Sequence, residues 1–220
     1  MHIYELRLWL PDRPGVLGQV ASRIGAVQGD VTGIEILERG GGFAIDELTI
    51  TLPDDPEVDL VDLLVSELRQ VDGVAVEDIR AVGGGRPDAT VAALDIAVEV
   101  AAAPAGARLF ACWVGLGRRF GAGWAVAVRS GDSEPLAATG TVPDPDWLAA
   151  FLGGGRHLDA TDAAAAPSDV AWAWLVGDGV ALACGRTSRP FHARERRQLA
   201  AFARLLDALG SDQGRGAEPT

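Results

Sequence analysis

The sequence DRPGVL at residues 12–17 joins an alternating apolar segment to a segment with helical periodicity. It predicts a turn from a strand into a helix, because Pro14 suits the first turn of a helix. Gly15 lacks a Cβ atom, so a ligand can approach the backbone closely at that position. The unpaired N–H groups and partial positive charge at a helix start suit a carboxylate. The turn therefore predicts a binding site for a small anion or zwitterion, and it does not suggest a bond-breaking step.

The segments on either side of this turn have different periodicities. Residues 3–10 alternate between apolar and polar side chains, as expected of a strand with one buried face. Residues 14–27 place apolar side chains at helical spacing. Four later segments predict a strand, a strand, a helix and a strand, at residues 31–38, 43–52, 57–70 and 74–82. This βαββαβ order predicts a ferredoxin-like antiparallel sheet with both helices on one face, and a second face, including Trp9, that needs a cover or a partner.

A second domain of different character is expected after residue 82. Residues 83–87 are Gly-rich and predict a linker, and residues 88–210 predict an α/β domain with a central antiparallel sheet. Its expected elements are two helices, a hairpin, a short helix with a loop, a second hairpin and a long helix, at residues 89–102, 105–119, 124–141, 147–169, 170–185 and 193–209. The polar residues 211–220 predict a disordered tail.

The composition excludes several classes of function. The 220 residues carry a net charge of −12, which argues against nucleic acid and anionic membranes as partners. Residues 1–82 hold 16 of the 31 acidic and 6 of the 19 basic residues, so the acidity is concentrated in the first domain. All basic residues are arginines, and the lack of lysine excludes Schiff-base chemistry and a Walker-type phosphate loop.

Other sequence features favour a cytoplasmic protein. Cys112 and Cys184 lie in apolar surroundings and are expected to be buried, reduced thiols. The N-terminus lacks the pattern of a signal peptide, and no apolar run is long enough to span a bilayer. The histidines His2, His157 and His192 are scattered, so neither a metal nor a cofactor is expected.

With this element order and this turn, residues 1–82 resemble the ACT domain family, whose members are small regulatory modules that bind amino acids, often at a dimer interface. The resemblance places Asp12 where ligand-binding members have Asn, and Gly15 at the helix-start glycine. Ionised Asp only accepts hydrogen bonds, so Asp12 would bind an ammonium group and would repel a carboxylate. The start of the second strand would also face the ligand. The implied ligand-binding residues are Asp12, Arg13, Gly15, Val16, Leu17, Asp30 and Val31.

Residues 88–210 resemble a GAF-like domain in the order of their elements and in the segment from Val180 to Phe191, followed by an amphipathic helix. GAF domains bind small molecules or form dimers. Trp124 and Trp172 could line a ligand pocket in this domain, although core packing is the simpler interpretation.

We therefore expect a cytoplasmic regulatory protein that senses a small amino acid, forms a homodimer and has no catalytic activity of its own. Two alternatives stay open on the sequence alone. The first is a dimerisation adaptor that binds no ligand. The second is an enzyme whose active site lies in the C-terminal domain.

Overall fold

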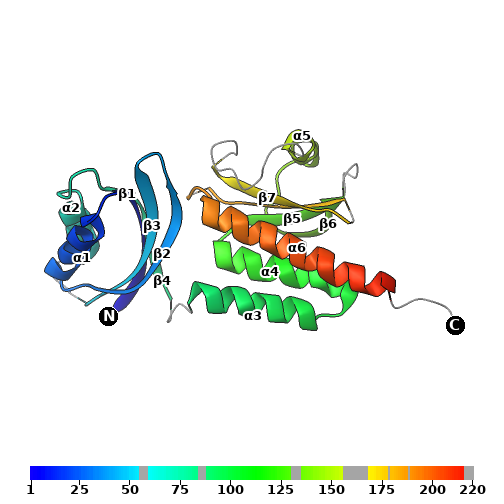
Figure 1. Cartoon of the computed structure of the whole chain (residues 1–220), viewed down its shortest axis with the longest axis horizontal. Helices are drawn as coiled ribbons and strands as arrows, with labels where there is room; N and C mark the ends of the chain where they lie inside the picture. Colours follow the sequence, from blue (N-terminus) through cyan, green and yellow to red (C-terminus); the bar gives the residue numbers. More distant parts are fainter. Residues whose placement is uncertain are drawn as a thin grey trace. The chain divides into compact units, whose positions relative to one another are not determined.

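The computed structural model divides the chain into two compact units, Met1–Asp88 and Ala89–Thr220. The described residues are 1–54, 59–83, 88–129, 135–155, 168–177, 179–187 and 189–215. Each unit contains one antiparallel sheet of four strands together with helices, so the fold is mixed α+β (Figure 1). The sequence predicted helices together with an antiparallel sheet in both units.

The N-terminal unit has the predicted order of elements. These are β1 (His2–Pro11), α1 (Val16–Ala26), β2 (Asp30–Gly40), β3 (Phe43–Leu52), α2 (Leu60–Leu68) and β4 (Ala75–Val82). The strands lie in the order β2-β3-β1-β4, and every neighbouring pair is antiparallel. Both helices lie on one face of the sheet (Figure 1). This is the ferredoxin-like topology, in which β2 and β4 are the edge strands.

Alternation along β1 builds the core of this unit. Leu6, Leu8 and Leu10 point to the helical face and are at most 3% exposed. They pack in one apolar cluster with the stripe of α1 that contains Val16 and Val20. Each buried side chain of this size contributes about 1.5–3 kcal/mol relative to an exposed one. The core therefore fixes α1, and with it the turn that precedes α1.

The second helix begins later than the sequence suggested. Asp59 caps α2, because its Oδ1 accepts hydrogen bonds from the N–H groups of Val61 (3.0 Å) and Asp62 (3.2 Å). The pattern predicted a helix from residue 57, but a side-chain cap of this kind places its residue just outside the helix. Residues 55–58 lie outside the described part.

The opposite face of the sheet carries cross-strand polar pairs. Arg7 Nε donates to Glu47 Oε2 at 2.6 Å, and the two residues are paired between β1 and β3. Arg80 Nε donates to Glu5 Oε2 at 2.7 Å from the paired position on β4. Glu5 and Arg7 alternate with the leucines along β1, so this strand contributes charged pairs to one face of the sheet and core side chains to the other.

The C-terminal unit has its own sheet, with the order β6-β5-β8-β7. Its elements are α3 (Ala89–Ala102), a short 3₁₀ helix (Ala105–Ala107), α4 (Arg108–Phe120), β5 (Trp124–Arg129), β6 (Pro135–Gly140), α5 (Pro145–Gly155), β7 (Val170–Leu175), β8 (Val180–Gly185) and α6 (Ala193–Arg215). The helices α3, α4 and α6 lie on one side of this sheet and α5 lies on the other (Figure 1).

The structure describes only part of the tail and of the linker that the sequence predicted. The last helix continues to Arg215, whereas a tail was expected from residue 211. Polar residues do not by themselves stop a helix, because each added residue gains one backbone hydrogen bond once the helix exists. Residues 216–220 of the expected tail, and residues 84–87 of the expected linker, lie outside the described ranges.

Candidate functional site

The turn at residues 12–17 links the end of β1 to the start of α1. The N–H of Asp12 donates to the carbonyl oxygen of Gly42 at 2.9 Å and extends the sheet ladder by one bond. Gly15 is the N-cap of α1 and has φ = 89°, in the left-handed region that favours glycine. Pro14 therefore precedes the cap. The sequence placed it inside the first helical turn, which is wrong because the left-handed Gly15 separates it from the helix.

The start of α1 offers backbone donors. No side chain caps this helix and its first turn contains no acidic residue. The first helical hydrogen bond runs from the N–H of Gln19 to the carbonyl oxygen of Gly15, at 3.1 Å. The N–H groups of the three residues between them have no acceptor within the helix and carry its partial positive charge. This end of α1 suits a carboxylate group.

Most of the predicted side chains at this turn reach the surface. Asp12 and Arg13 are exposed, and Leu17 is 38% exposed. Arg13 Nη2 lies 3.6 Å from Asp72 Oδ2, both at the surface. Val16 is the exception, because its side chain is buried in the core and only its backbone can serve a ligand.

The structure does not bring Asp30 and Val31 to this turn. Asp30 pairs with Thr51 on β3, and Thr51 pairs in turn with Ile3 near the start of β1. The turn follows the other end of β1, and the intervening nine residues of extended chain span about 30 Å. Asp30 and Val31 therefore lie at the opposite end of the sheet from Asp12 in the same chain.

Asp46 is a candidate that the sequence analysis missed. It lies on β3 opposite Leu8 of β1 and Ile36 of β2, on the face of the sheet that carries the core. Asp46 is only 5% exposed, and its Oδ1 has no hydrogen-bond partner among the described residues. Burial raises the pKa of its carboxyl group, the Arg39 guanidinium opposes this rise and the Asp12 carboxylate adds to it.

A signal for Asp46 exists in the sequence. Ala44 and Leu48 are in phase with Asp46 in the alternation of β3, and both are buried. Burial of an unpaired charge at such an inward position costs free energy, so an acidic residue there is itself a sign of a functional site.

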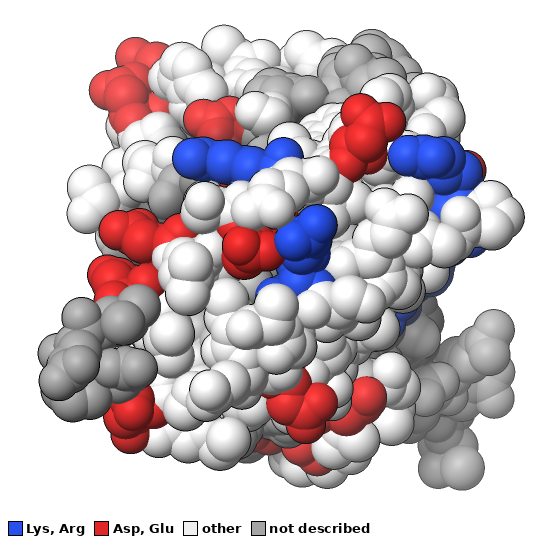
Figure 2. Space-filling model, turned by 90° about the vertical axis from the view of Figure 1, so that its left-hand side faces the viewer, with Lys and Arg blue, Asp and Glu red and all other residues white. Residues whose placement is uncertain are grey.

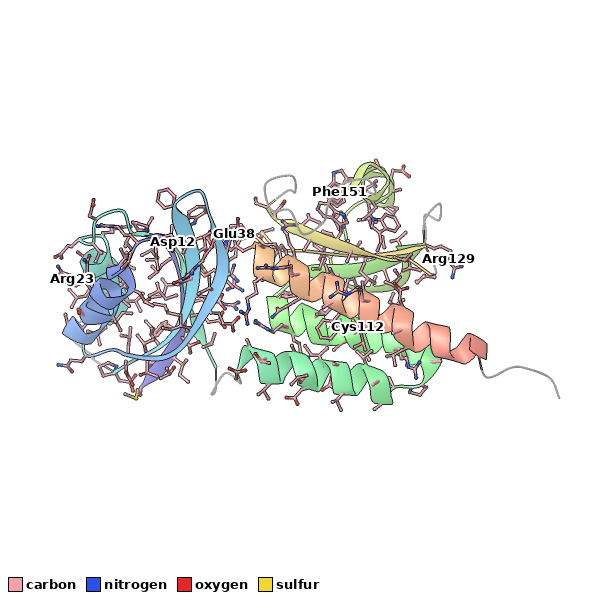
Figure 3. The ribbon with its side chains drawn as sticks, viewed as in Figure 1. Asp12, Arg23, Glu38, Cys112, Arg129 and Phe151 are labelled. Atoms are coloured by element: carbon pink, nitrogen blue, oxygen red, sulfur yellow. The ribbon has the colours of Figure 1, made fainter. Side chains whose placement is uncertain are left out.

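A surface groove of about 500 Å³ lies between α1 and the end of α2. It is lined by Gln19, Ser22, Arg23, Ala26, Gln70, Val71 and Asp72. Its arginine is already engaged, because Arg23 Nη1 donates to Glu67 at 2.8 Å and to Gln70 at 3.1 Å. Figure 3 shows Arg23 on the outer side of the helical layer and Asp12 closer to the sheet. None of the predicted ligand-binding residues lines this groove.

The surface charge on this side of the molecule is mixed. Figure 2 shows acidic and basic side chains interspersed over the side that carries α1 and α2. A small ligand with both charges fits such a surface better than a long polyanion does.

The two cysteines and the two tryptophans that the sequence singled out in the C-terminal unit are all packed into its interior to different degrees. Burial raises the pKa of both Cys112 and Cys184 to about 12, so neither thiol is a nucleophile at neutral pH. Trp172 is 1% exposed and packs in one apolar cluster with Trp124 and Leu148. These two tryptophans therefore form core packing under α5.

The described residues offer neither a metal site nor a membrane-spanning helix. Within these ranges, no group of three or more His, Cys, Asp or Glu residues is placed to hold a metal ion. Among the described helices, none has the length and apolar character needed to cross a bilayer.

Solved structures with a similar chain path include ACT domains. The ACT domain of GTP pyrophosphokinase from Chlorobium tepidum is 20% identical, with 37% of this chain and 97% of that domain covered and a TM-score of 0.29. An uncharacterized protein from Thermotoga maritima is 23% identical, with 37% and 98% covered and a TM-score of 0.29. An unknown protein from Galdieria sulphuraria is 12% identical, with 97% and 94% covered and a TM-score of 0.33.

No protein-family model matches the chain, and no curated protein matches it at a significant level. None of the three structures is described as a GAF domain, so the expected GAF-like likeness of the C-terminal unit has no support among them. The ACT-like description of the N-terminal unit rests on its βαββαβ order and on its sheet order β2-β3-β1-β4.

Proposed function

We propose that this protein is a regulatory sensor whose N-terminal unit binds a small amino acid at the turn between β1 and α1. The observation that carries the proposal is the placement of opposite charges at this turn. The uncapped start of α1 presents N–H donors, and the exposed Asp12, which carries a carboxylate, precedes this start in the turn. An amino acid is a zwitterion, so its carboxylate suits the helix start and its ammonium group suits Asp12.

A homodimer would complete this site. Asp30 and Val31 lie at the far end of the sheet in one chain, so they can reach the ligand only from a second copy. The edge strand β2 supports this arrangement, because Ile34 is 50% exposed and Ile36 is 39% exposed along it. Edge strands with apolar side chains favour pairing with another chain.

The proposal makes the chain a cytoplasmic regulator and not a catalyst. The high pKa of both thiols and the lack of lysine support this part, since they remove two common nucleophiles. We further propose that the C-terminal unit has a GAF-like role, either in ligand binding or in self-association. Its support is the order of helices and hairpins around one antiparallel sheet.

The test is a binding screen with the full chain. A thermal-shift screen over the amino acids should find a ligand that raises the melting temperature, because binding to the folded state stabilises it. Calorimetry then measures the affinity of the best ligand for the wild type and for Asp12→Ala. Loss of a charge-assisted hydrogen bond of about 1.5–3 kcal/mol should weaken binding roughly tenfold to a hundredfold.

Asp95→Ala is the matched control, since it removes an exposed carboxylate from α3 of the other unit. Its affinity should equal that of the wild type. If no amino acid binds at millimolar concentration, the adaptor alternative replaces the sensor. If Asp12→Ala binds as tightly as the wild type, the ligand site lies elsewhere.

A further inference from the structure

Asp46 is a buried acid, and one of its two carboxylate oxygens has no hydrogen-bond partner among the described residues. Its side chain is only 5% exposed, and its Oδ1 accepts no hydrogen bond from any described residue. A buried polar atom left unsatisfied in this way costs free energy, and a buried charge costs more. Such unsatisfied buried groups are few in folded proteins, so this one indicates a specific role for Asp46.

The position of Asp46 connects it to the turn. It lies on the helical face of β3, between Leu8 of β1 and Ile36 of β2, and Leu8 shares the core cluster with Val16 from the first turn of α1. Its carboxyl group interacts electrostatically with Asp12, which comes directly after β1. The register therefore places Asp46 opposite a residue four positions before Asp12, at the end of the sheet from which the turn leaves.

Two charged side chains act on the carboxyl group of Asp46, and Arg39 has a larger effect on its pKa than Asp12 has. Asp12 is the acidic neighbour, Arg39 on β2 is the basic one, and the first turn of α1 adds no acidic residue. Arg39 is an exposed side chain, and it does not donate a hydrogen bond to the buried Oδ1. A cation that reached Oδ1 would relieve both the missing hydrogen bond and the repulsion between the two acids.

We propose that Asp46 is the inner acceptor for the ammonium group of the ligand, with Asp12 as the outer acceptor. This inference rests on the proposed function and narrows it to ligands with a free, protonated primary amine. A primary ammonium group has three N–H donors, so one group can bind both the carboxylate of Asp46 on β3 and the carboxylate of Asp12 in the turn. A calcium ion would need six to eight oxygen ligands, which two carboxylates do not supply. The apolar side chains beside Asp46 strengthen the charge-assisted hydrogen bonds, because they exclude water.

The experiment compares three related compounds on the wild type and on Asp46→Asn. The first is the best amino acid from the screen. The second is the matching 2-hydroxy acid, which lacks the ammonium group, and the third is the matching amine, which lacks the carboxylate. Asn has the same shape as Asp but no charge, so it tests the charge with little change in packing.

The inference predicts two results. Asp46→Asn should bind the amino acid roughly tenfold to a hundredfold more weakly, while its weak affinity for the hydroxy acid stays unchanged. Without ligand, the same variant should melt about 4–8 °C higher than the wild type, because it no longer buries an unsatisfied charge. A merely structural role for Asp46 would lower the melting temperature and would weaken both compounds equally.

The possible failures are distinguishable. If the wild type binds the amino acid and Asp46→Asn binds it equally well, this inference is wrong and the proposed function stands. If the amine binds as tightly as the amino acid and needs Asp46, the ammonium site stands and the zwitterion sensor is wrong. If neither compound binds the wild type, both are wrong.

Discussion

The backbone of Gly15 sets the geometry of the turn at residues 12–17, and replacement of this residue by alanine is the first test. Its φ of 89° lies in the left-handed region, yet a Cβ atom built on Gly15 would meet nothing within 4 Å. The cost of Gly15→Ala is therefore backbone strain alone, about 1–2 kcal/mol. For a unit of this size, each kcal/mol lowers the melting temperature by about 4–8 °C.

Gly18 provides a matched control three residues away in the same helix. A Cβ atom at Gly18 also meets nothing within 4 Å, but this residue has no positive φ. Gly18→Ala should therefore stabilise the protein by about 0.5–1 kcal/mol, since alanine is the better helix former. Urea denaturation of both variants measures the two changes. Equal signs for the two substitutions would refute the assignment of Gly15 as a left-handed helix cap.

Two further predictions concern Asp46 and the edge strand β2. Burial raises the folded-state pKa of Asp46 above the usual 3.8, so the contribution of this group to stability falls as pH rises from about 3.8 through the raised pKa. The difference in unfolding free energy between Asp46→Asn and the wild type should therefore grow over that pH window. A pH-independent difference would contradict this prediction. Light scattering should give twice the 22.9 kDa mass of one chain for the wild type. Ile34→Asp on β2 should give single chains that bind the amino acid more weakly, because a second copy would no longer supply Asp30 and Val31. A dimer that survives this change would place the interface elsewhere.

Local patterns predicted the fold of the N-terminal unit well. Alternation in residues 3–10 and helical spacing in residues 14–27 depend only on neighbouring residues, so they identify β1 and α1 directly. The βαββαβ order then limits the sheet to few topologies. The start of α2 was misplaced because Asp59, which caps the helix, is one of several acids in that segment.

The candidate site was harder to predict because it depends on register between strands. Asp12 and Asp30 are both close to α1 in sequence, but α1 crosses the sheet from one end to the other and separates them. Asp46 is distant from the turn in sequence, and only the pairing of β3 with β1 places it opposite Leu8, four residues before Asp12. The sequence analysis explained Gly15 by the close approach of a ligand, whereas the left-handed φ of this residue by itself favours glycine.

The central claim is that the turn at residues 12–17 binds an amino acid. Its most direct test is an NMR titration of the full chain with the best amino acid from the screen. The account predicts the largest backbone amide shifts at Gly15, Val16 and Leu17, with saturation at the affinity found by calorimetry. Shifts confined to the groove residues Gln19, Arg23 and Gln70, or no shift at millimolar ligand, would contradict it.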